Sequence, residues 1–389
     1  MGTMLTSRNR LRLLFAVALA PVGAVACEQI LGLEPGELRT TTTSSTTTAG
    51  TGAAAGQGGH AGSGGQGAGG SGGQPVPELV ASGQKKPVFI TSDGVNVYWA
   101  NEGSGDDRVM KAPVDGSPDA EVAVAYNQAS PVGIAQLANV IYWSAQDDGA
   151  IRTALKDAVA CDGANCSQFA GGLAQPAALA IAADTLVWSE TDPPDAGAVR
   201  RSALTPPSAT DLATQQGQVW QLATGGGYAY WFTPSDGKLR RAPLTGGLPA
   251  VVWEQAPGPM PMAGQAGVAV SVDGAWVYWT NPDERTVSRA KATDTLDPST
   301  RVELAQGEDH PIAVAVDGTH VYWINAGSEC ATDAAPPYGS VKRLPFDADG
   351  GQIPEILASD LCDPKGIALD DNNAYWTVHG KGEVYRRRK

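Results

Sequence analysis

The stretch "PIAVAVDGTHVYWIN", residues 311–325, contains most of the pattern that decides the fold. An apolar run, an Asp-Gly pair and a second run ending in Tyr-Trp predict two short antiparallel strands joined by a hairpin turn. Its Trp323 belongs to a series that recurs every 43 to 53 residues: Trp99, Trp143, Trp188, Trp231, Trp279, Trp323 and Trp376. Self-similarity at a nearly fixed period indicates a repeat architecture.

The columns that precede each Trp repeat as well. Nine positions earlier the residue is always a large aliphatic: Ile90, Ile134, Leu179, Leu222, Val270, Val314 and Ile367. Eight positions earlier it is always small: Thr91, Ala135, Ala180, Ala223, Ser271, Ala315 and Ala368. A column of small residues fits a crowded innermost strand, and the Tyr-Trp pairs fit a wider gap further out, which large aromatic rings can fill.

Each unit therefore predicts four strands, which we call innermost, second, third and outer. Units of this length with four antiparallel strands are typical blades of a β-propeller. Seven Trp require seven outer strands, but the chain ends after the third strand "GEVYRR" (382–387), so "PELVAS" (77–82) must supply the last one. We predict an all-β fold over residues 76–389: a seven-bladed β-propeller of four-stranded antiparallel blades, with an N-terminal strand completing the last blade (1+3 closure).

The tetrads that begin one residue before each Trp resemble the YWTD repeats of LDL-receptor-type propellers over residues 75–389. They read "YWAN", "YWSA", "VWSE", "YWFT", "YWTN", "YWIN" and "YWTV". None has the family's Asp in fourth place, and the family has six such repeats. The resemblance therefore implies the fold and not a function.

The N-terminal residues predict export. Basic residues precede an apolar run, 13–25, that is too short to span a bilayer and ends in "AVAC", so residues 1–26 read as a signal peptide. Cys27 follows the cleavage position and fits a lipobox; lipid on Cys27 would also account for the odd one of five cysteines. The alternative is plain secretion. "CEQILGLEPG" (27–36) resembles the start of many myxobacterial lipoproteins, a resemblance that with Glu28 implies an outer-membrane lipoprotein on the periplasmic side or the cell surface.

Residues 27–75 are predicted to be a lipidated N-terminus and a disordered Thr/Ser/Gly-rich tether, because this stretch has too few apolar side chains to form a core. The net charge is −14, and removal of the three signal-peptide arginines makes it −17. This balance argues against nucleic acid or anionic lipid as a partner and for a soluble, self-repelling surface. We expect a monomer, attached to the membrane through Cys27 only.

The residues directly before the innermost strands are the candidates for lining the central mouth: Lys86, Ser130, Gln175, Gln218, Ala266, His310 and Asp363. This set is polar but mixed, with one Asp and one His in adjacent blades. A metal-assisted lyase or lactonase would need several carboxylates or histidines there. The sequence therefore predicts no catalytic residue, no metal ligand and no cofactor.

Two charge patterns leave alternatives open. Basic residues recur in the third strands, at Lys111, Arg201, Arg241, Arg289, Arg343 and Arg386. They could form an anion site, although packing of each stem and pairing with the neighbouring blade is the stronger interpretation. The predicted hairpins between second and third strands are acidic: Glu102, Asp106 and Asp107; Asp147 and Asp148; Glu190, Asp192 and Asp195; Asp283 and Glu284; Glu329 and Asp333. These are either solvated loops or a negative field that selects cationic or protein partners.

Four cysteines remain for the ring and allow three pairings. Cys161 and Cys166 share one loop, whereas Cys330 and Cys362 fall in two loops expected on the same face. We predict disulfides Cys161–Cys166 and Cys330–Cys362. Together the sequence predicts a tethered, non-catalytic scaffold that binds an unknown protein or small molecule on its loop face. An enzyme acting at the central mouth is the alternative.

Overall fold

The structure is a computed structural model that describes residues 76–102, 107–117, 120–157, 159–233, 235–254, 266–271, 273–292, 298–327 and 339–389. These residues belong to one compact unit. The predicted signal peptide (1–26), the lipidation site Cys27 and the tether (27–75) lie outside the described residues and stay predictions. The described part contains no helix long and apolar enough to cross a membrane.

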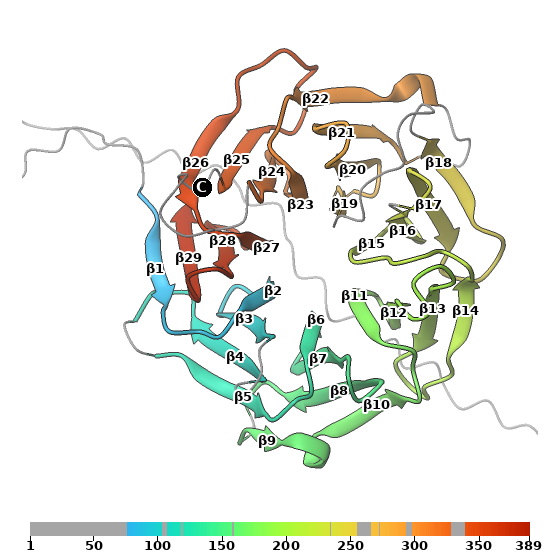
Figure 1. Ribbon diagram of the computed structural model, residues 1–389, viewed down its shortest axis with the longest axis vertical. Helices are drawn as coiled ribbons and strands as arrows, with labels where there is room; N and C mark the ends of the chain where they lie inside the picture. The colour runs from blue at the N-terminus through green and yellow to red at the C-terminus, as the bar shows by residue number, and fades with distance from the viewer. Residues whose placement is uncertain are drawn as a thin grey trace, which may run out of the picture. The chain divides into compact units, whose positions relative to one another are not determined.

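Seven antiparallel sheets surround a central axis, and each runs from an innermost strand to an outer one (Figure 1). The first four blades are β2 (Pro87–Ser92), β3 (Asn96–Asn101), β4 (Arg108–Pro113) and β5 (Val122–Tyr126); β6 (Pro131–Leu137), β7 (Val140–Ala145), β8 (Ala150–Leu155) and β10 (Ser167–Gly171); β11 (Pro176–Ala182), β12 (Thr185–Glu190), β13 (Ala198–Ala203) and β14 (Thr210–Ala213); β15 (Leu222–Gly225), β16 (Tyr228–Thr233), β17 (Lys238–Pro243) and β18 (Ala250–Glu254).

The other three blades follow the same order. They are β19 (Val268–Val270), β20 (Trp276–Asn281), β21 (Thr286–Lys291) and β22 (Val302–Gln306); β23 (Pro311–Val316), β24 (His320–Asn325), β25 (Gly339–Pro345) and β26 (Glu355–Leu361); β27 (Pro364–Leu369), β28 (Asn373–Val378), β29 (Glu383–Arg388) and β1 (Glu78–Ala81). Short 3₁₀ turns occupy Gly163–Asn165 and Pro298–Thr300. The innermost strands contact one another in sequence and β27 contacts β2, so the ring is closed.

The closure is made by the strand that the sequence assigned to it. β1 pairs antiparallel with β29, with Glu78 opposite Arg386 and Leu79 opposite Tyr385. Glu78 and Arg386 also form an ion pair of 2.6 Å, and Val80 and Ala81 are buried against the core of blade 7 and blade 1. The seven-bladed propeller with 1+3 closure is confirmed.

One strand was not foreseen. β9 (Cys161–Asp162) lies in the connection from β8 to β10 and pairs in parallel with β5 of the preceding blade. The sheet of blade 1 therefore has five strands. A disulfide joins Cys161 to Cys166 and closes the short loop that presents β9, which confirms this predicted pairing.

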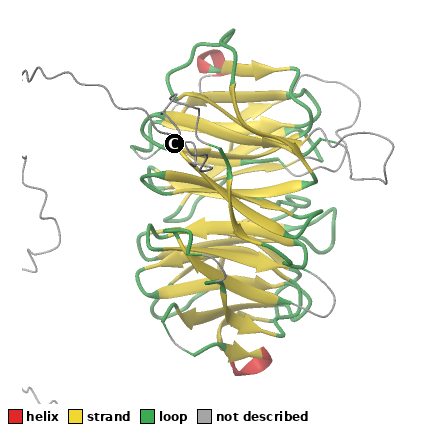
Figure 2. Cartoon of the chain, turned by 90° about the vertical axis from the view of Figure 1, so that its left-hand side faces the viewer, coloured by secondary structure: helices red, strands yellow, loops and turns green. Residues whose placement is uncertain are grey.

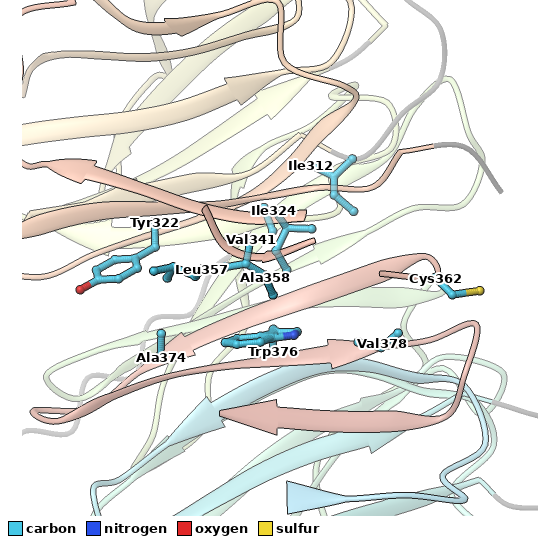
Figure 3. Packing of buried hydrophobic residues seen from close by; sticks show 11 residues of the cluster. Ile312, Tyr322, Ile324, Val341, Leu357, Ala358, Cys362, Ala374, Trp376 and Val378 are labelled. Carbon is cyan, nitrogen blue, oxygen red and sulfur yellow. The ribbon is translucent and has the colours of Figure 1, made fainter. Parts of the chain in front are cut away.

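The seven repeating Trp side chains form the core between blades. All seven are 0% exposed, and each packs against residues of an adjacent blade. In Figure 3, Trp376 of β28 lies beneath Val341, Leu357 and Ala358 of blade 6. Removing roughly 200 Å² of largely apolar surface from water stabilises the fold by about 5 kcal/mol per indole before entropic costs. This packing explains why Trp recurs in every blade.

Most of these indoles also have a polar partner that the sequence analysis missed. The side-chain oxygens of Gln84, Gln128, Gln216 and Glu308 accept the indole N–H of Trp99, Trp143, Trp231 and Trp323, at 2.9–3.1 Å. Each acceptor stands 15 residues before its Trp, so the repeat did carry the signal. In blade 3, Glu190 takes this role instead, with its Oε1 3.1 Å from Trp188 Nε1.

The basic residues of the third strands join neighbouring blades. Five of them donate to backbone carbonyls in the turn after the third strand of the next blade. The donors and their acceptors are Lys111 to Lys156, Arg201 to Leu244 and Thr245, Arg241 to Ala292, Arg289 to Phe346 and Asp347, and Arg386 to Val114. Arg343 pairs instead with Glu355 of its own blade. Pairing with the neighbouring blade is confirmed for the other five residues and is wrong for Arg343, and the anion-site alternative is not needed.

Aspartates shape the turns between innermost and second strands. Asp317 Oδ1 accepts the N–H groups of Thr319 and His320 at 2.7 and 2.8 Å, which fits the preference of Asp for turns. Its Oδ2 lies 2.7 Å from Nζ of Lys389. Burial acts to raise the pKa of Asp317, but these bonds outweigh it and hold the pKa well below the ordinary 3.8.

Candidate functional site

Two sets of connections meet on one face of the ring, which we call the loop face. They are the hairpins between second and third strands and the links that lead into the innermost strands. Backbone bonds tie the two sets together, since Lys86, Ser130 and Asp363 accept the N–H groups of Glu102, Gln146 and His379 at 3.0–3.1 Å. Figure 2 shows the ring edge-on, with its turns gathered on two opposite faces.

The residues predicted to line the mouth lie on this face. Five of them have a positive φ, between 51° and 56°, and each of the five precedes a proline: Lys86, Ser130, Gln175, His310 and Asp363. The left-handed conformation turns the chain sharply into the innermost strand, at a cost of order 1–3 kcal/mol for a residue other than glycine. Three of them are exposed, Lys86, Gln175 and His310, whereas Gln218 is half-buried and Ala266 is buried. That they line a ligand site stays a prediction.

Asp363 is the member of this set with the densest polar contacts. Its Oδ2 lies 2.9 Å from Nδ1 of His379, and its Oδ1 lies 2.7 Å from Nζ of Lys365. Burial acts to raise the pKa of Asp363, but the bonds from His379 and Lys365 outweigh it, so the pKa lies below the ordinary 3.8. His379 lies in the hairpin between β28 and β29 on the same face, and the sequence did not predict that it meets Asp363.

His310, the histidine among the residues predicted to line the mouth, does not belong to the cluster that Asp363 forms with His379 and Lys365. Its side chain is 54% exposed and its Nδ1 lies 3.7 Å from Asp309. His379 is therefore held by a carboxylate in a partly buried site, whereas His310 is a solvated surface group.

A pocket of about 360 Å³ lies beside the Asp363–His379 pair, where the link from β1 to β2 meets the hairpin between β28 and β29. Gln84, Lys85 and Lys86 form one wall, and the hairpin from His379 to Gly382 forms the other; we call it the seam pocket. The walls are tightly joined, because Gln84 N donates to Gly382 O at 2.9 Å. A Cβ at Gly382 would come within 2.0 Å of Gln84 O, so this position requires glycine.

Several acids of the loop face are bonded within their own blade. Glu190 is buried, and its carboxylate accepts the indole of Trp188, accepts the N–H of Ala174 and pairs with Arg200 at 3.0 Å. Asp148 pairs with Arg152 at 2.7 Å. The interpretation of Glu190 as a surface charge was wrong, because it fills a structural role. Asp106, Glu329 and Asp333 lie outside the described residues.

Two predictions for this face concern metal ligands and the second disulfide. Within the described ranges, no group of three or more His, Cys, Asp or Glu side chains could hold a metal ion. Cys362 is buried and disulfide-bonded. Cys330, its predicted partner, lies outside the described residues, so Cys330–Cys362 stays a prediction.

Comparison with known proteins supports the architecture. No protein-family model matches the chain, and no protein of curated function does. Among solved structures, virginiamycin B lyase from Staphylococcus aureus has a TM-score of 0.60 at 10% identity, covering 81% of this chain and 99% of that one. The chain is a seven-bladed β-propeller.

Two further solved structures match over a similar share of the chain. Hydrazine synthase of Kuenenia stuttgartiensis matches with a TM-score of 0.60 at 14% identity, over 80% of this chain and 97% of that one. The WD40 propeller of Doa1 matches with a TM-score of 0.58 at 10% identity, over 80% and 97%. At such identities the likeness shows the fold alone, and function must be argued from the residues of this chain.

Proposed function

We propose that this chain is a non-catalytic binding propeller of the cell envelope, which captures a ligand or partner on its loop face. It would be exported, lipidated on Cys27 and held at the outer membrane by the tether 27–75. The observation that carries the non-catalytic part is the state of Asp363, whose two oxygens are each bonded to a basic group.

This arrangement favours recognition over proton transfer. A general base works best with a pKa near the working pH and a free lone pair directed at substrate. Asp363 has a lowered pKa and charge-assisted bonds from Lys365 and His379, so its charge is already neutralised. Such a carboxylate fixes the geometry of its neighbours and leaves the pocket walls to contact a ligand.

An enzyme remains the second candidate, and one observation favours it. A carboxylate bonded to Nδ1 orients an imidazole and leaves Nε2 as the nitrogen that can take a proton, as in catalytic dyads. If His379 were such a base, the chain would turn over a substrate at the loop face, and His379→Ala would abolish that turnover.

Virginiamycin B is a reasonable first substrate to test, given the lyases of the same fold. On the binding proposal, virginiamycin B incubated with the chain and Mg²⁺ stays intact by mass spectrometry. Time-dependent conversion that is lost in His379→Ala, or in a His310→Ala, Asp363→Asn double variant, would replace the binding proposal with the enzymatic one.

Binding on the loop face can be tested by site-specific photo-crosslinking in cells. A photoreactive residue at the exposed Gln175 reports on the loop face. The same residue at Leu248, which is 91% exposed in the β17–β18 connection on the opposite face, is the control. We expect a discrete adduct from position 175 and none from position 248. Equal labelling from the two positions, or none from either, contradicts the proposal.

The proposed anchor has its own test. Cys27→Ser should move the chain from the membrane fraction to the soluble fraction, because the anchor depends on the acyl chains carried by that residue. Retention of the variant in the membrane fraction would remove the lipid anchor from the proposal.

A further inference from the structure

The seam pocket differs in charge from the equivalent places in other blades. Four hairpins between second and third strands share one backbone form, with a left-handed residue in the last position: Gly149, Gly237, Arg285 and Gly382, with φ of 58°, 64°, 59° and 68°. In three of them the preceding residue is acidic, at Asp148, Asp236 and Glu284. In the closing blade it is Lys381. The sign of the charge is inverted at the seam.

The acidic side chains of the other three hairpins form ion pairs, whereas Lys381 forms none with a described residue. Asp148 pairs with Arg152 and Asp236 with Arg240, four residues further on in the third strand. In blade 7, the residue four positions after Lys381 is Tyr385, which cannot form an ion pair of this kind. In the part of the chain that the structure describes, Lys381 is exposed and has no ion pair.

Two further ammonium groups border the same pocket. Lys85 and Lys86 are exposed, and neither forms an ion pair with a described residue. Asp363, the half-buried carboxylate that contacts His379, is already bonded to Lys365 and to His379. The seam pocket therefore carries three uncompensated positive charges in a chain whose net charge is −14.

We propose that the seam pocket binds a phosphate group of a small ligand, which would be the ligand of the loop face; this inference rests on the proposed binding function. Lysine binds phosphate as a point charge, and three ammonium groups balance the two or more negative charges of a phosphate ester or diphosphate. The volume of about 360 Å³ lies within the range of small-molecule sites. His379 lines the same pocket.

The phosphate could belong to a soluble ester or to a phospholipid headgroup, and the experiment separates these sources. Titration calorimetry of the Cys27→Ser chain with inorganic pyrophosphate tests the soluble form. Sedimentation of the same chain with vesicles of phosphatidylglycerol in phosphatidylcholine tests the headgroup. Lys381→Ala is the test variant. Arg388→Ala is the matched control, because Arg388 is an exposed cation at the other end of β29.

We expect Lys381→Ala to weaken binding about tenfold in low salt and less in high salt, as for an exposed charge at close range, with Arg388→Ala unchanged. A Lys381-dependent signal with pyrophosphate assigns a soluble ester, and one with vesicles only assigns a headgroup. Absence of both signals, or equal weakening in the control, overturns the proposal. The adduct at position 175 is measured without pyrophosphate or vesicles, so it can still form when both signals here are absent. Such a result would overturn the phosphate site and leave the binding function standing, whereas loss of the adduct would overturn the binding function itself.

Discussion

In blade 6, the carboxylate of Glu308 contacts three side chains, those of Trp323, Asn325 and Lys342, and this cluster has a counterpart in blade 1. Glu308 is 4% exposed; its Oε2 lies 3.0 Å from Trp323 Nε1 and 3.0 Å from Lys342 Nζ, and it also accepts a bond from Asn325. Lys342 stands opposite Trp323 in the register of β24 and β25. Lys342→Met would leave the buried carboxylate without its cation.

The expected cost follows from burial. Removing one partner of a buried ion pair costs about 3–5 kcal/mol. The side chain of Lys342 is 22% exposed, so water can partly replace it, and we expect about 2–3 kcal/mol. The assay is equilibrium unfolding in urea, followed by Trp fluorescence.

Blade 1 shows how the loss can be reversed. There, Gln84 Oε1 accepts both Trp99 Nε1 at 3.1 Å and Asn101 Nδ2 at 3.0 Å, and Met110 stands opposite Trp99. The double variant Glu308→Gln, Lys342→Met reproduces this set, so it should lie within about 1 kcal/mol of the parent. The reasoning is refuted if the double variant is no more stable than Lys342→Met alone, because neutralising the buried carboxylate would then have recovered none of the lost stability.

Two further predictions concern local stability. Cys161→Ser should lower the free energy of unfolding by about 2 kcal/mol, the loop-entropy value for a separation of 5 residues, and should raise hydrogen exchange in β9; an unchanged urea midpoint would contradict this. Asp317 has a lowered pKa, so its contribution to stability is complete above the unfolded pKa, near 3.8, and declines as the pH falls toward the folded pKa. Asp317→Asn should therefore be less stable than the parent at pH 7 and should lose less stability than the parent between pH 5 and pH 2, measured by thermal unfolding. Parallel pH profiles for the two proteins would count against it.

The fold was predictable because the same packing contacts between blades recur in every repeat of the sequence. Each blade meets its neighbours through the same wedge, so a Trp and a small residue recur at the same places in all seven blades, and a basic residue recurs in six of them. The strand β1 was predictable by counting, since only one outer strand was missing. β9 was not, because a two-residue strand in a loop carries no periodic signal and depends on the Cys161–Cys166 link.

For the candidate site, the sequence predicted only the face of the ring on which it lies. The repeat frame places Asp363 and His379 on the same side of the ring, but it gives no distance between side chains. The seam pocket joins Lys85 and Lys86 to Lys381, residues nearly 300 positions apart, and only the closed ring brings them together. The inverted charge at Lys381 becomes visible once the hairpins are aligned on their shared left-handed residue.

The acceptors of the Trp indoles are an intermediate case. Gln84, Gln128, Gln216 and Glu308 form a column at a constant distance from Trp, yet they lie in links outside the predicted strands. Polar residues in such links usually face solvent, so their burial could not be inferred from composition.

The closed ring is tested most directly by hydrogen exchange on the chain with and without residues 76–83. In the parent, the amides of β29 that face β1 should be protected, because β1 covers that edge. In the truncated chain these amides should exchange faster by ~10²-fold or more, whereas β13, still covered by β14, should be unchanged. Equal protection of β29 in the two proteins would contradict the closure and with it the seven-bladed ring.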